Sequence, residues 1–174
     1  MPKREFATIE ELQLETGKEV AVTDWIDIAQ DRIDKFAEAS GDFQWIHVDA
    51  ARAQRESPFG TTIAHGFLTL ALVSQFAYAA VGIREPFAMM INYGVNKVRF
   101  PAPVRCGSRI RSRHKLLEVS AIEGGWQTRW LVTIEVENQP KPACVAETIT
   151  RYYQQPPQSA ASSPDQGACG PSRV

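Results

Sequence analysis

A long segment without charged side chains is the feature that most constrains how this chain can fold. From Ser57 to Ile83 the sequence contains no Asp, Glu, Lys or Arg. The pattern predicts an apolar helix over about residues 64–81 of this segment. Pro58 and His65 interrupt the apolar runs, which are too short to insert into a membrane. A helix that is apolar nearly all round is typical of the buried axis of a soluble core, so we expect no membrane partner.

The apolar pattern changes after Pro86 from a helical period toward the alternation that is typical of strands. Shorter helical patterns come earlier, including one that opens with the capping-box sequence Thr8–Glu11 and one that ends at Gly41. Helices followed by a run of strands predict an α+β domain, in which an antiparallel β-sheet wraps the long apolar central helix. The predicted strands cover residues 89–100, 109–119, 126–137 and 143–153.

Composition divides the chain into one folded domain, residues 1–153, and a C-terminal tail, residues 154–174. The tail reads QQPPQSAASSPDQGACGPSRV and contains few apolar residues whose burial could offset the entropy of ordering it. We therefore expect a disordered tail and a domain that folds without it.

Charge and cysteine content exclude several function classes. The net charge of -1 lacks the basic excess of nucleic-acid-binding proteins, so we expect no nucleic-acid partner. The three cysteines show no CxxC spacing, which argues against a zinc knuckle or a disulfide framework. The N-terminal residues lack the apolar core of a secretion signal. These features favour a cytoplasmic protein.

The stretch SGDFQWIHVD, residues 40–49, places Asp42 and His47 among aromatic and apolar residues. Because the two are five positions apart, their side chains would point to different sides of a helix and to opposite faces of a strand. They can cooperate as a general acid and base if an irregular loop curls them together. The alternative is that Asp42 caps a helix or forms an Asx-turn and that His47 is a packed ring.

Three motifs, SGDFQWIHVD, FGTTIAHGFLTL and KVRFPAPVRCG, together resemble the MaoC-like dehydratases, (R)-specific enoyl-CoA hydratases with a hot-dog fold. The resemblance extends from about Phe6 to Tyr153 and implies a single hot-dog domain. Many members carry Asn-Pro where this chain has Gln44 and Trp45, a departure that bears on the shape of the loop and on acyl selectivity.

The resemblance implies that Asp42 and His47 hold one water molecule and hydrate trans-2-enoyl-CoA to (R)-3-hydroxyacyl-CoA, without a metal or a redox cofactor. The backbone N–H of Gly66 is expected to bind the thioester oxygen as this oxygen gains negative charge. The alternative is that Gly66 is simply a glycine at a helix start. Ser74 lies roughly two turns further along the helix, where it either contacts the site or bonds back within its own helix.

Two other functions share this fold and stay open at this point. One is an acyl-CoA thioesterase, in which Asp42 directs water at the thioester carbonyl. The other is a hot-dog protein that binds an acyl thioester without turnover. In each case the small-molecule partner is acyl-CoA or an acyl group on its carrier protein. A homodimer is expected because one sheet and one apolar helix leave apolar surface uncovered.

The arginines Arg109, Arg111 and Arg113 alternate along one face of a predicted strand. They either contact the phosphates of CoA or belong to a solvated face of the sheet.

Overall fold

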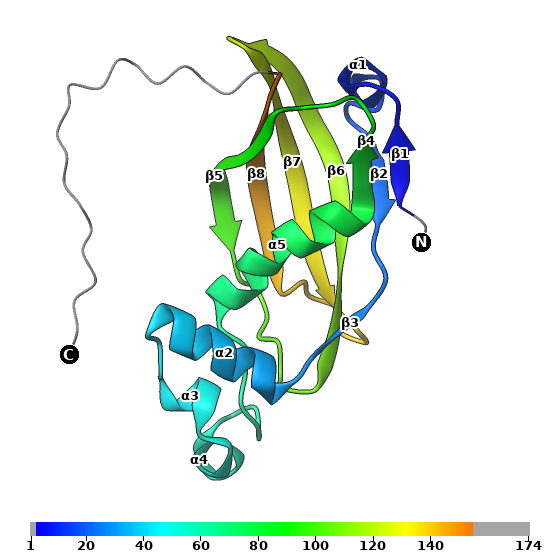
Figure 1. Cartoon of the computed structure of the whole chain (residues 1–174). Coiled ribbons are helices and arrows are strands. Elements are labelled where there is room, and N and C mark those ends of the chain that lie inside the picture. The colour runs from blue at the N-terminus through cyan, green and yellow to red at the C-terminus, as the bar shows by residue number, and fades with distance from the viewer. Residues whose placement is uncertain (1–2, 155–174) are drawn as a thin grey trace, which may run out of the picture.

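The computed structural model describes residues 3–154, so the predicted tail lies outside the described residues except for Gln154. In the described chain short strands alternate with the first helices, longer strands follow, and the long helix α5 (Gly66–Ala80) crosses one face of an antiparallel sheet (Figure 1). The predicted α+β class is therefore confirmed.

The strands are β1 (Arg4–Phe6), β2 (Glu19–Val22), β3 (Ile26–Ile28), β4 (Val81–Ile83), β5 (Met89–Arg99), β6 (Ser108–Ile122), β7 (Gly125–Val136) and β8 (Cys144–Tyr153). The helices are α1 (Ile9–Gln13), α2 (Gln30–Ser40), α3 (Trp45–Val48), α4 (Ala50–Glu56) and α5 (Gly66–Ala80).

The main sheet has the strand order β2-β6-β7-β8-β5, and β3 also pairs with β6. Its inner face forms the core beneath α5. His114, Val132 and Ala146 are neighbours across three adjacent strands, and all three are buried. Each predicted strand overlaps one of β5 to β8, because the alternation of apolar residues follows the two faces of the sheet.

The outer face of the sheet carries charged side chains in pairs. Three arginines of β6 each contact a glutamate of a neighbouring strand or of the turn that follows one. Their nitrogen–oxygen distances are 3.1 Å for Arg109–Glu137, 2.7 Å for Arg111–Glu135 and 2.7 Å for Arg113–Glu19. The intervening residues of β6, among them Ile110 and His114, are buried on the opposite face. The solvated-face alternative for these arginines is therefore confirmed.

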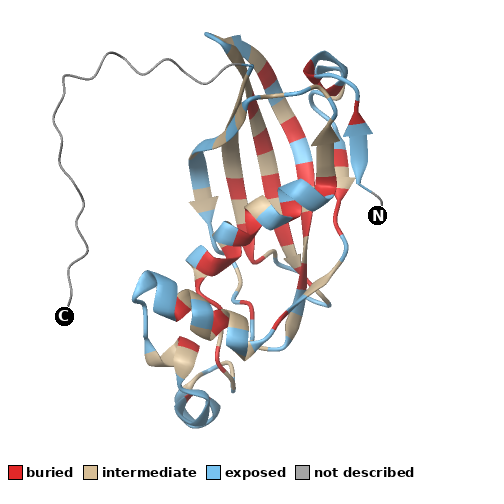
Figure 2. Ribbon diagram, in the orientation of Figure 1, coloured by how far each residue is buried: buried red, intermediate tan, exposed pale blue. Residues whose placement is uncertain are grey.

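The sheet covers only one face of α5. Leu68, Leu72 and Phe76 are buried, whereas Phe67 and Tyr78 are 70% and 62% exposed. Buried and exposed stretches alternate along the ribbon of α5 in Figure 2. The sequence predicts an apolar helix at the axis of the core and also predicts that one sheet and one helix leave apolar surface uncovered. Within one chain the single sheet reaches only one side of α5. An apolar helix face is thus left open to solvent. Among residues 3–154, no helix has the length and apolar character needed to cross a membrane.

Short elements close the two ends of the sheet. At one end α1 lies beside the parallel pair β1–β4, and Glu85 accepts a hydrogen bond from the N–H of Ile9 at 3.0 Å. Thr8 caps α1 by accepting a hydrogen bond from the N–H of Glu11, as the predicted capping box requires. At the other end α2, α3 and α4 gather beside the start of α5 (Figure 1).

The packing of α1 into the core can be tested with a matched pair of leucines. Leu12 is 0% exposed and Leu14 is 75% exposed. We expect Leu12→Ala to lower the free energy of unfolding by about 2–5 kcal/mol, because it removes buried methyl groups and leaves a cavity. Leu14→Ala should change the free energy of unfolding by less than about 0.5 kcal/mol. Urea unfolding followed by circular dichroism measures both, and equal losses would contradict the packing of α1.

Candidate functional site

The end of α2 sets the position of Asp42. Gly41 has a left-handed backbone, with φ 75°, and its N–H closes the helix on the carbonyl of Ala37 at 2.8 Å. Glycine adopts this conformation without the strain of a side chain. Asp42 follows, and its Oδ1 accepts a hydrogen bond from the N–H of Gln44 at 3.3 Å. Asp42 thus forms the Asx-turn of the structural alternative, but Gly41 caps the helix, and the exposed carboxylate can accept further hydrogen bonds.

His47 lies on the short helical turn α3, so the irregular loop that was expected to carry it is confined to residues 42–44. Gln44 is the N-cap of this turn and Trp45 is its first helical residue. Proline is well tolerated at the first position of a helix, so the position of Trp45 is one that proline can also occupy. The helical turn that carries His47 therefore forms with Gln44 and Trp45 in place of Asn-Pro.

Backbone contacts fix the ring of His47 and its tautomer. The residue is buried, and its Nδ1 lies 2.7 Å from the carbonyl oxygen of Ile63. Because a carbonyl oxygen only accepts hydrogen bonds, Nδ1 carries the proton and the lone pair is on Nε2. The side chain of Gln30, on α2, also donates to the backbone carbonyl of His47 at 2.8 Å. These contacts hold α3 between α2 and the segment that leads into α5.

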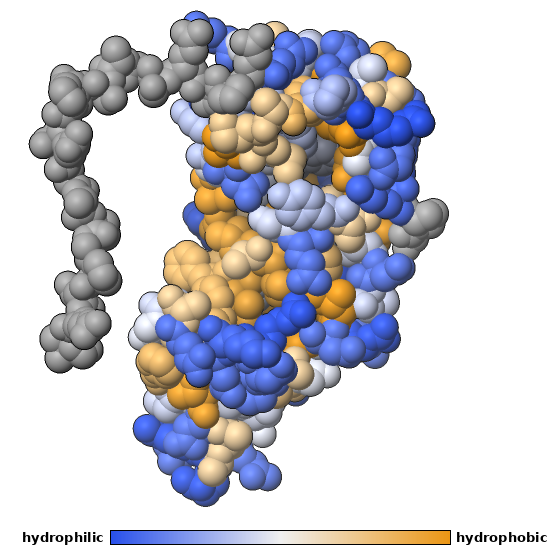
Figure 3. All heavy atoms as spheres, in the orientation of Figure 1, coloured by the Kyte–Doolittle hydropathy of each residue, from blue (hydrophilic) through white to orange (hydrophobic). Residues whose placement is uncertain are grey.

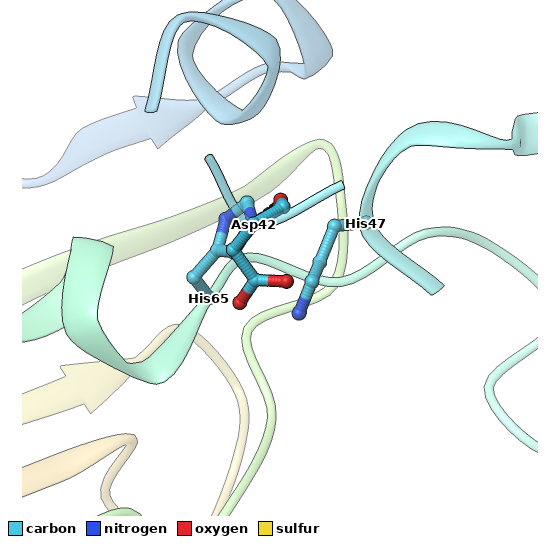
Figure 4. A group of neighbouring side chains, drawn as sticks. All are labelled: Asp42, His47 and His65. Carbon is cyan, nitrogen blue, oxygen red and sulfur yellow. Dashed lines mark hydrogen bonds between the residues drawn. The ribbon is translucent and has the colours of Figure 1, made fainter. Parts of the chain in front are cut away.

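The structure brings Asp42 and His47 together with a third residue, His65. A carboxylate oxygen of Asp42 and one ring nitrogen of each histidine lie within 4.8 Å of one another (Figure 4). The rings of His47 and His65 are stacked, with centroids 3.8 Å apart and an angle of 27° between their planes. Sequence reasoning missed His65, and the signal for it is a histidine directly before Gly66 in an otherwise apolar helix start.

Burial is the main reason that the pKa of His47 lies below its ordinary value, because loss of water disfavours the charged imidazolium. The hydrogen bond to Ile63 opposes this shift. The charge interaction with His65 lowers the pKa of His47 further, and the carboxylate of Asp42 raises it. Near neutral pH His47 is therefore a neutral ring that accepts hydrogen bonds through Nε2.

Asp42, His47 and His65 are residue types that bind metals, but their geometry does not suit a shared ion. A bound metal lies in the plane of each imidazole, about 2 Å from the nitrogen. Two rings stacked 3.8 Å apart and nearly parallel do not share such a point well. In addition, Nε2 of His65 lies 2.9 Å from the backbone carbonyl oxygen of Asp42, with which it forms a hydrogen bond. The arrangement suits hydrogen bonding and proton transfer better than metal coordination.

Gly66 is the first residue of α5, where backbone N–H groups have no acceptor within the helix. It follows His65 directly, so the helix N-terminus adjoins the three side chains. A Cβ at Gly66 would lie 2.9 Å from the ring of Phe100. Glycine therefore allows Phe100 to pack against the start of the helix, a structural reason for this residue beside the expected approach of a substrate.

Ser74 lines a cavity of about 210 Å³ between α5 and the strands β5 to β8. Its hydroxyl oxygen accepts a hydrogen bond from Nδ2 of Asn92, on β5, at 3.1 Å. Ser74 is thus held toward the sheet and lies apart from Asp42, His47 and His65. The cavity has mainly apolar walls, which include Leu70, Val73, Ala77, Val95, Trp130 and Ile149.

A family model described as a MaoC like domain matches residues 11–137. The chain belongs to the MaoC-like dehydratase family. Among curated proteins it is similar to 3-hydroxyacyl-thioester dehydratase Z of Mycobacterium tuberculosis, with 48% identity over 153 residues that cover 86% of this chain and 98% of that protein. Nodulation protein N of Rhizobium leguminosarum is 44% identical over 77% of this chain and 84% of that protein.

A solved structure shows the same fold. The unliganded R-hydratase PhaJ1 from Pseudomonas aeruginosa matches with a TM-score of 0.67 and 23% identity, over 92% of this chain and 96% of that chain. The hot-dog fold that the sequence motifs predict for this MaoC-like domain is thereby confirmed.

Another buried histidine, His114, makes stability depend on pH. His114 lines the cavity, and its Nε2 lies 2.9 Å from the hydroxyl of Ser112. Burial lowers the pKa of His114 from 6.5 to about 4. As the pH falls below 6.5, the unfolded chain takes up a proton that the folded chain does not, so stability decreases until the pH reaches about 4.

We expect the contribution of His114 to lower the free energy of unfolding by about 2 kcal/mol between pH 6.5 and 5. His114→Gln lacks the titrating ring and should lose less stability over the same range. Urea unfolding of both proteins at the two pH values gives the difference. Identical pH dependence in the two proteins would show that His114 is not desolvated.

Proposed function

We propose that this MaoC-like domain is an enzyme that catalyses the reversible hydration of trans-2-enoyl-CoA to (R)-3-hydroxyacyl-CoA. The observation that carries this proposal is the placement of two proton acceptors, the carboxylate of Asp42 and Nε2 of His47. A hydrogen bond to an oxygen acceptor spans about 2.7–3.0 Å. A carboxylate oxygen of Asp42 and a ring nitrogen of His47 lie within 4.8 Å of each other, a separation that one water molecule can bridge with two such hydrogen bonds.

The two hydrogen bonds orient the water for attack on the substrate. With both of its hydrogens directed at Asp42 and His47, the water has a lone pair free to attack C3 of the enoyl thioester. His47 takes one proton through Nε2, because its Nδ1 is already protonated. Asp42 holds the other O–H bond and stabilises the imidazolium. The C3–O bond forms, the proton on Nε2 passes to C2 on the same face, and the second proton stays on the product hydroxyl.

The N-terminus of α5 supplies electrostatic stabilisation in this proposal. As water attacks C3, negative charge develops on the thioester oxygen. The backbone N–H of Gly66, aided by the positive end of the helix dipole, stabilises this charge. The cavity that Ser74 lines runs along the same helix and takes the acyl chain between its apolar walls.

The identity of the substrate rests on relatives and on the fold. Similar proteins are named 3-hydroxyacyl-thioester dehydratase and 3-hydroxybutyryl-CoA dehydratase. Solved structures of the same fold are R-hydratases, which supports the (R) product. We propose CoA as the carrier, with the acyl carrier protein as the alternative, and a reaction that uses neither metal nor redox cofactor. The free thiols of Cys106 and Cys144 support the expected cytoplasmic location.

The catalytic roles predict the effect of removing each proton acceptor. Asp42→Asn keeps the size of the side chain but loses its charge, and His47→Gln loses the titrating ring. Each should lower kcat by roughly 10²–10⁴ with a smaller effect on KM. The double variant should be little worse than the poorer single variant, because both residues act on the same water. Loss of the enoyl absorbance, with chiral analysis of the product, measures the reaction.

The controls separate catalysis from folding and from the rival functions. Thermal unfolding of each variant tests whether loss of the Asx-turn of Asp42 has lowered stability. Release of free thiol at the rate of substrate loss would instead indicate a thioesterase. Tight binding of acyl-CoA without turnover would indicate a binding protein. Near-normal hydration by well-folded Asp42→Asn would contradict the proposed mechanism.

We also propose that the enzyme is a homodimer whose interface includes β5. Among the described strands β5 pairs only with β8, so its other edge has unpaired backbone groups. Met90, Tyr93 and Val95 on this strand are 41%, 55% and 49% exposed. Apolar atoms also gather over the open face of α5 (Figure 3). A second copy would cover both surfaces.

Sedimentation tests the dimer. We expect the wild-type protein to sediment as a dimer at micromolar concentration and Val95→Lys to shift toward the monomer, because the charge would be buried without a partner. Leu14→Lys, on an exposed leucine far from β5, should leave the dimer intact. A stable wild-type monomer that still turns over substrate would rule out an interface that the site requires.

A further inference from the structure

We propose that His65 is a positioning residue for the hydration step, which holds Asp42 through its backbone and His47 through its ring. This inference rests on the proposed function. His65 occupies the last position before α5, so it connects the helix N-terminus with both catalytic side chains. It is 2% exposed and belongs to the interior of the site rather than to its surface.

The first contact of His65 anchors the loop of Asp42. Nε2 of His65 donates a hydrogen bond to the backbone carbonyl of Asp42 at 2.9 Å. Since the carbonyl only accepts, Nε2 must carry the proton. The bond holds the chain at Asp42 in place, and the Asx-turn to Gln44 then directs the side chain. The N–H of Asp42 also donates a hydrogen bond to Oγ of Ser40, at 3.4 Å, and both Asp42 and Gln44 are exposed.

The second contact supports the ring of His47. The two imidazoles stack with their centroids 3.8 Å apart. The ring of Phe36, on α2, also contacts His65, with ring centroids 5.0 Å apart and an angle of 53° between the planes. The ring of His65 thus contacts both an aromatic ring and the catalytic ring. Together with the bond from Nδ1 of His47 to Ile63, the stack leaves His47 little freedom to tilt.

His65 is buried although one of its two ring nitrogens makes no hydrogen bond, which indicates that the other nitrogen has a role. Among the described residues, its Nδ1 is the buried side-chain nitrogen or oxygen atom without a hydrogen-bond partner. A buried polar atom without a partner lowers the stability of the folded state. Phenylalanine would keep the stacking without this cost. What phenylalanine lacks is the Nε2–H that binds Asp42, and this bond is the reason for histidine at this position.

Three substitutions separate the two contacts. His65→Gln keeps an N–H donor but loses the ring, His65→Phe keeps the ring but loses the donor, and His65→Leu loses both. Misplacement of a catalytic group by about 1 Å can cost about 10²-fold in rate. We expect His65→Leu to lower kcat by about this factor with KM little changed, because His65 does not touch the substrate. His65→Gln and His65→Phe should each recover part of the loss.

A spectroscopic measurement follows the same contacts without the reaction. The chain has three histidines, so the His47 ring can be followed by NMR titration. The titratable groups that face His47 are Asp42 and His65. In His65→Phe the ring of His47 stays buried but the charge interaction with His65, which lowers the pKa of His47, is removed, so the pKa of His47 should rise toward its ordinary value. The acid limb of kcat/KM should move to higher pH with it.

The outcomes distinguish this inference from the proposed function. Leu12→Ala, far from the site, serves as a control that loses stability but should keep the kcat of its folded fraction. If well-folded His65→Leu keeps wild-type kcat, or if His65→Gln is no better than His65→Leu, the positioning role is wrong and the hydratase assignment stands. If the wild-type protein does not hydrate enoyl-CoA, the proposed function is wrong, and the NMR titration still decides whether His65 controls the His47 ring.

Discussion

Burial of one face of α5 on the inner face of the sheet determines where the other elements can lie. Leu68, Leu72 and Phe76 fix the helix across β6, β7 and β8, and this places its N-terminus at the end of the sheet where α2 and α3 gather. The helix N-terminus is electrostatically positive and has free N–H groups. The packing of the core therefore determines the position of the helix N-terminus, and the site for a substrate that gains negative charge lies at this position.

The site itself depends on the short segment that leads into α5. The backbone carbonyl of Ile63 orients His47. The backbone N–H of Ile63 donates to the carbonyl of Ile46 at 3.0 Å. His65, next but one along the chain, binds Asp42 and stacks on His47. The same chain segment thus holds both proton acceptors while it starts the helix that supplies the N–H of Gly66. The packing that positions α5 in the core therefore also sets the geometry of the site.

The sequence predicts those features that depend on local periodicity. The apolar run that becomes α5 and the alternation in β5 to β8 are visible because each element buries a regular set of positions. Asp42 and His47 are also identifiable, through spacing that no regular element explains. The short helix α3, the role of His65 and the identity of the side of α5 that stays open are not predictable in the same way. They depend on contacts between distant segments, such as Ile63 with His47, and on which side of the helix the sheet covers.

Backbone carbonyls, rather than acidic side chains, orient both imidazoles of the site. In triads of the serine protease type a buried carboxylate holds the histidine and stabilises its imidazolium form. Here Ile63 fixes the tautomer of His47 without adding a full negative charge, and burial keeps the pKa of the ring low. Burial thus makes the ring give up a proton readily, and the nearby carboxylate of Asp42 offsets part of this effect when the ring is protonated. A reversible addition of water requires this balance, since the group that removes the proton from water in one direction must return it in the other.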